Sequence, residues 1–177
     1  MIKKPISQSY WVVPGRFLAG EYPGLGNDKA GTRTRLKAFL NAGFEEFIDL
    51  TTENERPQYS SMLKHEAESI GLVVRHHRFS FTDFSVPSQA KMVSALDAID
   101  AALTASHTVY LHCVGGIGRT GITVGCHLIR HGMEPTDALR QLRELYRASL
   151  QSLIVPTTPE TEEQTRFILN WKEHGLA

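Results

Sequence analysis

The chain has 177 residues, of which 41% are hydrophobic and 21% are charged, and its 19 basic residues are balanced by 19 acidic ones. This composition is typical of one globular domain, and the absence of any run of like charges argues against nucleic acid or an anionic membrane as a partner. No eighteen apolar residues run together and no signal peptide follows the first lysines, so a cytoplasmic protein is expected. Two cysteines, Cys113 and Cys126, are too few for a disulfide framework, and we expect free thiols in a monomer.

The first half of the chain alternates short β runs with amphipathic helices. In order, the patterns predict a hairpin, a helix, a buried strand, a second helix and a further strand, at residues 10–20, 28–43, 45–51, 60–71 and 72–79. Gly43 and Gly71 are expected to end the two helices. This alternation predicts one α/β domain over residues 1–177, a central and mostly parallel sheet flanked by helices, with residues 1–9 as a candidate flexible segment.

The second half continues the same pattern. After a loop at 80–87, the sequence predicts a helix at 88–106, a strand at 107–112, a helix after Arg119, and two further helices around 136–146 and 158–171. In the last helix Thr158 is the expected N-cap and Pro159 the first helical residue.

Ligand sites in open α/β sheets lie outside the carboxyl ends of the strands. The loops after Leu50, Phe79 and His112 should therefore meet at one edge of the sheet.

The stretch from His112 to Gly121, HCVGGIGRTG, joins the predicted strand to the helix that follows. Its GIGRTG portion matches the dinucleotide-binding pattern, but the acidic residue expected about twenty positions further on is missing. The dinucleotide interpretation also gives no reason for Cys113 or Arg119. A loop that binds an oxyanion explains both residues better.

Cys113 and Arg119 are six positions apart, so the loop between them can wrap once around a tetrahedral oxyanion. The arginine supplies a planar fork for two phosphoryl oxygens, and the backbone N–H groups and the helix N-terminus bind the others. The same surroundings favour a thiolate, which makes Cys113 a nucleophile aimed at phosphorus. The expected phosphate-binding residues are Val114, Gly115, Gly116, Ile117, Gly118 and Arg119.

Two neighbours of this loop have supporting roles. Thr120 is expected to donate its hydroxyl to the departing thiolate, and His112 to orient the loop rather than to transfer a proton.

HCVGGIGRTG resembles the signature loop of the protein tyrosine phosphatase superfamily, and the chain length resembles its dual-specificity branch. That resemblance implies a general-acid aspartate in a loop ahead of the cysteine, with a proline shortly after it, and FTDFSVP supplies Asp83 and Pro87. An acid is also needed on chemical grounds, because the leaving oxygen must be protonated as the P–O bond breaks. Glu53 and Glu55, after another strand, are the alternatives to Asp83.

In relatives a late glutamine positions the hydrolytic water, and Gln164 is the candidate here, with exposed helix surface as the alternative. Related phosphoinositide phosphatases commonly have lysines inside the loop, where this sequence has Val114 and Ile117. That difference favours protein substrates.

The resemblance and the residues together predict a phosphatase that needs no metal or cofactor, forms a phosphocysteine, and acts on phosphotyrosine, phosphoserine or phosphothreonine in proteins. The alternatives are an inactive phosphopeptide-binding module and a phosphatase of a non-protein ester such as an inositol phosphate or phosphoinositide. Sulfur transfer and arsenate reduction use a similar cysteine loop, but neither needs Asp83.

Other histidines and the second cysteine are not assigned a function. His127 and His131 are four apart on a predicted helix and could ligate a metal, but the sequence shows no convergent third ligand, so no metal site is expected. His76 and His77 should point to opposite faces of their strand. Cys126 is expected to be a buried apolar residue, with a regulatory disulfide to Cys113 as the alternative.

Overall fold

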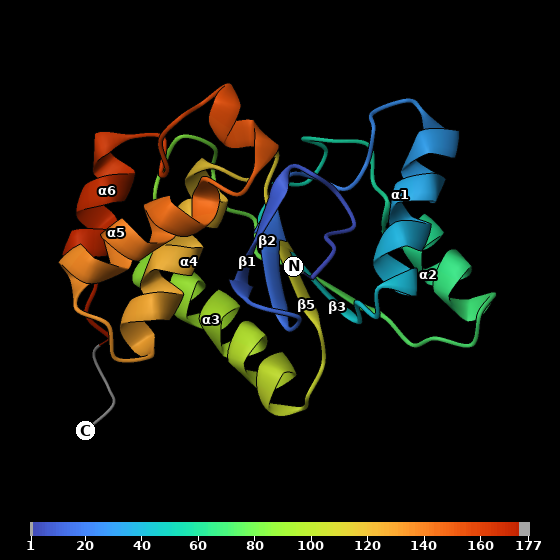
Figure 1. The fold of residues 1–177 in the computed structure, drawn as a ribbon, viewed down its shortest axis with the longest axis horizontal. Helices are drawn as coiled ribbons and strands as arrows, with labels where there is room; N and C mark the ends of the chain where they lie inside the picture. The colour runs from blue at the N-terminus through green and yellow to red at the C-terminus, as the bar shows by residue number, and fades with distance from the viewer. Residues whose placement is uncertain (1, 174–177) are drawn as a thin grey trace.

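The computed structural model describes residues 2–173, which form a five-stranded sheet with helices on both faces (Figure 1). The strands are β1 (Ser9–Val13), β2 (Phe17–Gly20), β3 (Glu46–Asp49), β4 (Arg75–Arg78) and β5 (Val109–His112), in the order β1-β2-β5-β3-β4. Only β1 runs antiparallel to its neighbour. The prediction of an α/β fold with a mostly parallel sheet is confirmed.

The helices divide between the two faces of the sheet, as Figure 1 shows. One face carries α1 (Lys29–Asn41) and α2 (Ser60–Glu68). The other carries α3 (Gln89–Thr104), α4 (Gly118–Arg130), α5 (Pro135–Tyr146) and α6 (Glu162–Leu169), with a short 3-10 helix at Leu150–Leu153 before α6. In this second layer α4 contacts α3, α5 and α6, so it is the central helix of the layer.

Two apolar cores result from the period-two alternation of the central strands. In β5, Val109 and Leu111 join the core under α3 and α4, and Tyr110 joins the core under α1 and α2. All three side chains are fully buried. The strand that leads into the signature loop is therefore packed on both faces, which gives the loop a rigid base.

The ends of most elements agree with the sequence prediction. Gly43 and Gly71 have positive φ values of 81° and 71° just after α1 and α2, where they end the helices as expected. The predicted start of the last helix is wrong. The N-cap is Thr161 rather than Thr158, because Thr161 and Gln164 form a capping box. Thr158 instead donates its hydroxyl to the carbonyl oxygen of Ile117, 2.8 Å away.

The N-terminal segment lies against the rest of the fold. Ile6 is buried in the core under α1 and α2, and the Lys4 ammonium donates to the carbonyl of Ala148 at 2.6 Å. Lys4 and Ile6 therefore pack against the folded domain.

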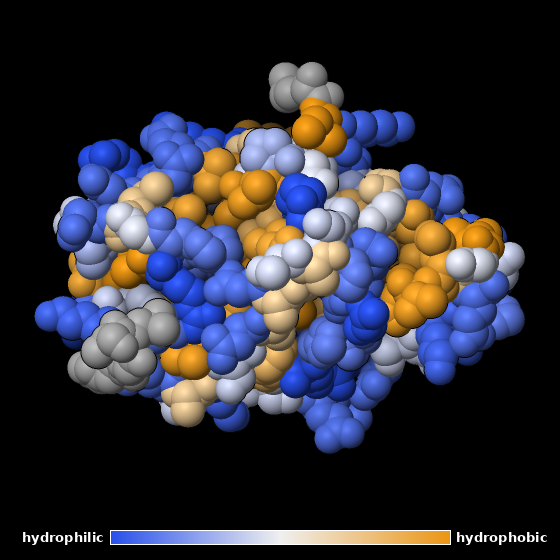
Figure 2. Space-filling view, turned by 90° about the horizontal axis from the view of Figure 1, so that it is seen from below, coloured by the Kyte–Doolittle hydropathy of each residue, from blue (hydrophilic) through white to orange (hydrophobic). Residues whose placement is uncertain are grey.

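The surface seen in Figure 2 is mostly polar, with apolar side chains in small groups between polar ones. Across residues 2–173, no helix has both the length and the apolar character needed to cross a membrane.

Candidate active site

The signature loop turns sharply between β5 and α4, and Gly116 makes the turn possible. Gly116 has a φ of 72°, and a Cβ atom on it would lie 2.3 Å from the backbone carbon of Gly20. Only glycine fits both restrictions. The loop is tied to the end of β2 by a hydrogen bond of 2.9 Å from the Tyr22 N–H to the carbonyl of Val114.

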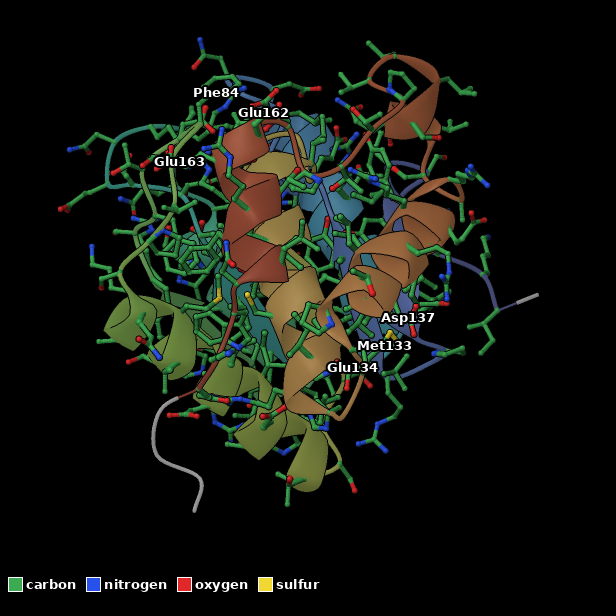
Figure 3. All side chains as sticks on the ribbon, turned by 90° about the vertical axis from the view of Figure 1, so that its left-hand side faces the viewer. Phe84, Met133, Glu134, Asp137, Glu162 and Glu163 are labelled. Atoms are coloured by element: carbon green, nitrogen blue, oxygen red, sulfur yellow. The ribbon has the colours of Figure 1, made fainter. Side chains whose placement is uncertain are left out.

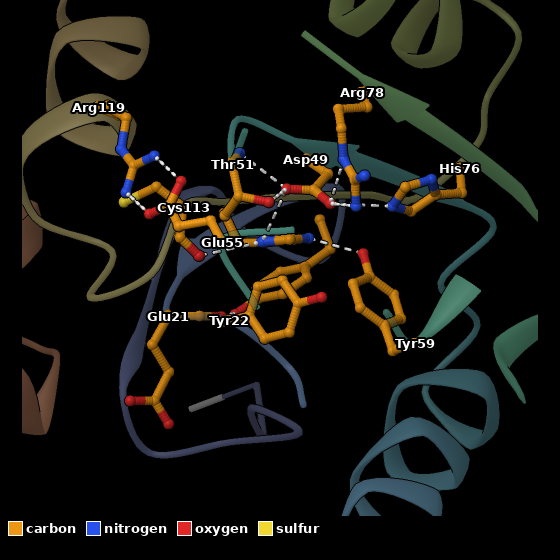
Figure 4. A network of polar contacts seen from close by, with 12 residues as sticks. Glu21, Tyr22, Asp49, Thr51, Glu55, Tyr59, His76, Arg78, Cys113 and Arg119 are labelled. Atoms are coloured by element: carbon orange, nitrogen blue, oxygen red, sulfur yellow. Dashed lines mark hydrogen bonds and ion pairs between the residues drawn. The ribbon is translucent and has the colours of Figure 1, made fainter. Parts of the chain in front are cut away.

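Arg119 stands at the start of α4 with its side chain only 1% exposed. Its Nη1 and Nη2 atoms donate to the two carboxylate oxygens of Glu55 at 2.8 and 2.7 Å (Figure 4). Nη1 also donates to the carbonyl of Phe81, and Nη2 lies 3.0 Å from Asp83 Oδ1. The Nε atom is buried and has no hydrogen-bond partner among the described residues. One donor of the guanidinium is thus left for a ligand.

Cys113 lies at the base of the same loop. Its side chain is almost fully buried, and Figure 4 shows the sulfur beside the Arg119 guanidinium, whose charge it interacts with. The hydroxyl of Thr120, in the first turn of α4, is buried and has no hydrogen-bond partner among the described residues. An unpaired buried hydroxyl is costly, so this donor also suits a group bound in the loop.

His112 precedes the cysteine and is fully buried. Its Nε2 lies 2.6 Å from the Tyr59 hydroxyl, and its Nδ1 lies 3.2 Å from the carbonyl oxygen of Cys113. Burial lowers the pKa of His112 to about 4, although the negative charge of Asp49 acts against the shift. The imidazole is therefore neutral at pH 7, a state suited to holding the loop by hydrogen bonds rather than to proton transfer.

Asp49, at the end of β3, anchors the edge of the sheet beneath this histidine. Its Oδ1 accepts hydrogen bonds from the Thr51 N–H and hydroxyl, and its Oδ2 is paired with Arg78 and His76. Burial alone would raise the pKa of Asp49, but the hydrogen bonds from His76 and from the Thr51 hydroxyl and N–H hold it well below its ordinary value. The charged carboxylate fixes the start of the loop that leads to Glu55.

The loop after β4 brings Asp83 to the site. The Asp83 side chain is 44% exposed, and its Oδ1 also accepts from the Phe84 N–H. Phe84 is exposed and has a positive φ of 55°. Figure 3 shows Phe84 close to Glu162 and Glu163 at the start of α6. The loops after β3, β4 and β5 thus meet at one edge of the sheet, as the sequence predicted.

Gln164 in α6 is fully buried, so the alternative of an exposed helix surface is wrong for this residue. Its amide nitrogen donates to the Ser85 carbonyl at 3.3 Å. A Cβ atom added to Gly118 would lie 2.9 Å from the same nitrogen, so Gln164 lies between the signature loop and the loop that carries Asp83.

Glu160 is a site residue that the sequence analysis missed. A Cβ atom on Gly118 would lie 2.4 Å from its Oε2, which places the carboxylate at the N-terminus of α4. Burial and the nearby charge of Asp83 raise the pKa of Glu160 above its ordinary value. No sequence motif marks this position, because it reaches the loop only through the irregular segment before α6.

The remaining candidates lie outside this group. Glu53 is exposed, unlike Glu55 two positions further on. Cys126 is fully buried, and both it and Cys113 are free thiols. Burial raises the pKa of Cys126 well above its ordinary value. His76 and His77 pair with different carboxylates, Asp49 and Glu46, as expected for opposite faces of β4.

Fold and site together define a phosphatase-type domain of the protein tyrosine phosphatase superfamily. Residues 24–133 match the family described as "Polymorphic toxin system, DSP-PTPase phosphatase", and the chain belongs to that family.

Curated relatives are dual-specificity and tyrosine phosphatases. The chain is 29% identical over 140 residues to the dual specificity protein phosphatase CDC14B of Mus musculus, a match that covers 75% of this chain and 26% of the relative. It is 22% identical over 128 residues to "Phosphatidylinositol 3,4,5-trisphosphate 3-phosphatase and protein-tyrosine-phosphatase PTEN1" of Arabidopsis thaliana, covering 71% of this chain and 30% of the relative. The chain therefore spans less than a third of either relative.

Among solved structures, the active form of Tk-PTP superimposes with a TM-score of 0.66 at 23% identity. The superposition covers 92% of this chain and 93% of that one. At this identity the likeness describes the fold.

Proposed function

We propose that the protein is a cysteine-dependent phosphatase that hydrolyses phosphate monoesters on proteins through a phosphocysteine intermediate. The observation that carries this proposal is the arrangement of Arg119. Glu55 holds its two terminal nitrogens, Asp83 lies beside it, and its Nε has no hydrogen-bond partner among the described residues, while the Cys113 sulfur lies beside the guanidinium. Because Glu55 fixes both terminal nitrogens of this buried arginine, its free Nε–H is held in place to bind a phosphoryl oxygen.

In the first chemical step the Cys113 sulfur forms a bond to phosphorus while the ester P–O bond breaks. Arg119 Nε and the N–H groups of the loop bind the nonbridging oxygens, where negative charge concentrates in the transition state. The Asp83 carboxyl gives its proton to the departing oxygen. The products are the free alcohol or phenol and the phosphocysteine.

In the second step a water molecule attacks the phosphocysteine. The Asp83 carboxylate accepts a proton from this water, and the sulfur departs as a thiolate stabilised by the Thr120 hydroxyl. Gln164, buried between the two loops, is the residue we assign to orienting the water. Glu55 is a positioning residue that acts through Arg119.

The charges around the loop support a protein monoester rather than a polyanionic headgroup as substrate. Three carboxylates, those of Glu55, Asp83 and Glu160, interact with the single guanidinium of Arg119. Phosphates beyond the reacting one would meet these carboxylates with no lysine in the loop to offset the repulsion.

The test is hydrolysis of an aryl phosphate by the whole chain in the presence of a chelator. We expect turnover, and Cys113→Ser should fold but lose it, because a serine hydroxyl is barely ionised there. Rapid quenching of the wild-type reaction should yield phosphate bound to Cys113. A folded wild-type protein that binds phosphotyrosine peptide without turnover would identify a binding module and refute the proposal.

A substrate panel addresses the second half of the proposal. Phosphotyrosine, phosphoserine and phosphothreonine peptides should have a higher kcat/KM than soluble phosphoinositides. The reverse ranking would mean that the substrate is a non-protein ester, while the chemistry at Cys113 would stand.

A further inference from the structure

At the end of α4 remote from the signature loop, three side chains of α3 and α4 are aimed at one point. Asp100 of α3 meets His127 of α4 and His131, the residue that caps α4. Asp100 Oδ1 lies 3.5 Å from His127 Nδ1 and 3.0 Å from His131 Nε2. Taking one ligand atom from each residue, all three atoms lie within 4.8 Å of one another. The third ligand that the histidine pair lacked in the sequence is thus present in the fold.

His127 points independently to a ligand. His127 is only 4% exposed, and its Nδ1 atom is buried without a hydrogen-bond partner among the described residues. The Phe17 ring packs against the imidazole in a T-shaped arrangement, with 5.1 Å between ring centroids, and it offers no hydrogen-bonding atom to Nδ1. A buried nitrogen left unpaired is unfavourable, and the lone pair of a neutral imidazole nitrogen is a good ligand for a transition metal.

The spacing of the ligand atoms suits a tetrahedral ion. Bonds of 2.0–2.1 Å at tetrahedral angles separate ligand atoms by about 3.3 Å. The two separations that involve Asp100, 3.5 and 3.0 Å, lie on either side of that value. The His131 side chain is 55% exposed, so it can turn to close the remaining separation, and it leaves one position open to water.

The surrounding charges favour a cation at this point. Arg130 Nη1 donates to the other oxygen of Asp100, Oδ2, at 3.0 Å and to Asp97 Oδ1 at 2.9 Å. Arg130 is also paired with Glu173. Three carboxylates therefore surround one guanidinium. The arginine holds Oδ2 of Asp100, so Oδ1 faces the two histidines. Hydrogen-bond partners outside a metal site commonly orient its ligands in this way.

We propose that Asp100, His127 and His131 form a binding site for a divalent transition metal ion of the Zn²⁺ class, with water as the fourth ligand. Two imidazole nitrogens and one carboxylate oxygen suit zinc or cobalt and are too few oxygens for calcium or magnesium. Eight residues of helix, about 12 Å, separate Arg119 from His127, so the ion is not in reach of the reacting phosphoryl group. Its role is to link α3 to the helix that carries the signature loop.

The experiment adds Zn²⁺ to the full chain after chelator treatment and measures heat of binding and Tm. The Cys113→Ser variant serves as the reference protein, because the active-site thiolate can itself bind zinc. We expect one ion per chain and a rise in Tm. His131→Ala, at an exposed position that should not affect folding, should weaken binding at least tenfold and abolish the rise in Tm.

Two further variants make the result specific. Asp100→Asn should weaken zinc binding as His131→Ala does. His77→Ala is the matched control, since His77 is also partly exposed and lies 3.0 Å from a carboxylate, that of Glu46, without belonging to the three-ligand group. It should bind zinc as the reference does.

The proposal is overturned if the reference protein binds no zinc, or if His131→Ala binds it with unchanged affinity and an unchanged rise in Tm. The three residues would then be an ordinary hydrogen-bonded cluster.

Co²⁺ in place of Zn²⁺ gives a second readout. The reference protein should show the visible bands of tetrahedral cobalt with nitrogen and oxygen ligands, and octahedral bands would also contradict the assignment. Hydrolysis of aryl phosphate by wild-type enzyme with chelator is independent of this site, so failure of one proposal leaves the other intact.

Discussion

Glu55→Gln separates the positioning of Arg119 from acid catalysis, because Glu55 and Asp83 both contact the same guanidinium. The Glu55 carboxylate accepts hydrogen bonds of 2.8 and 2.7 Å from Arg119. Together with hydrogen bonds from the Thr52 N–H and hydroxyl, and against the effect of burial, these lower its pKa from 4.5 to about 2. At 1.36 kcal/mol for each pKa unit, the difference corresponds to about 3 kcal/mol of stabilisation of the charged form. The side chain is only 20% exposed, so solvent screening is limited.

The stability effect of this variant should depend on pH in a defined direction. The folded-state pKa of Glu55 is below the unfolded value, so its contribution is complete above about pH 4.5 and disappears as the pH falls towards 2. Glutamine keeps one hydrogen bond to the arginine, so we expect a loss of about 1–3 kcal/mol in the free energy of unfolding at pH 7. Urea denaturation at pH 7 and at pH 3 measures it, and the difference between wild type and variant should shrink at the lower pH.

The kinetic effect distinguishes the two carboxylates. Displacing Arg119 should lower kcat/KM by about 10²-fold for good and poor leaving groups alike, because the guanidinium binds the phosphoryl group and not the leaving oxygen. Asp83→Asn should instead lower turnover of phosphotyrosine or an alkyl phosphate by about 10²–10⁴-fold and spare a strongly activated aryl phosphate. Glu53→Gln, at an exposed position, is the control and should resemble wild type. Leaving-group dependence in Glu55→Gln and none in Asp83→Asn would refute the assignment of the acid.

Three further outcomes are expected. Arg119→Lys should lose more than about 10²-fold in kcat/KM on an aryl phosphate although it keeps its charge, since one ammonium cannot be held by Glu55 as the guanidinium is and also reproduce the Nε–H donor; a near-normal rate would mean that the arginine is structural. Gly116→Ala should abolish most turnover and lower Tm, because its Cβ would lie 2.3 Å from the Gly20 backbone at a φ of 72°, and full activity would contradict the described loop path. Tyr59→Phe should cost about 1–3 kcal/mol in unfolding free energy by removing the 2.6 Å partner of His112 Nε2, and unchanged urea denaturation would show that this contact is not stabilising.

The sequence predicted those parts of the site that depend on local pattern. Cys113 and Arg119 are held by one continuous loop between a strand and a helix, so their spacing alone indicates that they meet. The edge at which Asp83 joins them follows from the parallel sheet, because the carboxyl ends of parallel strands lie at the same edge.

The sequence could not predict which carboxylate binds the guanidinium. Glu53 and Glu55 follow the same strand, and only the path of the loop, with Asn54 at a positive φ of 65°, exposes one and turns the other inward. Backbone conformations of this kind are set by contacts that the loop makes in the fold, and the residue types alone do not indicate them.

The segment between α5 and α6 limits sequence analysis most, since it has no periodicity to interpret. The pattern favoured Thr158 as a helix cap, but in the fold this residue is buried and donates to the Ile117 carbonyl at 2.8 Å. Because that bond fixes the chain two residues before Glu160, it brings a carboxylate to the N-terminus of α4, beside the loop that we propose binds the phosphoryl group. A negative charge there competes with phosphate for the helix N-terminus. The segment between α5 and α6, whose sequence pattern did not indicate Glu160, thus gives the site a carboxylate that opposes additional negative charge on a substrate.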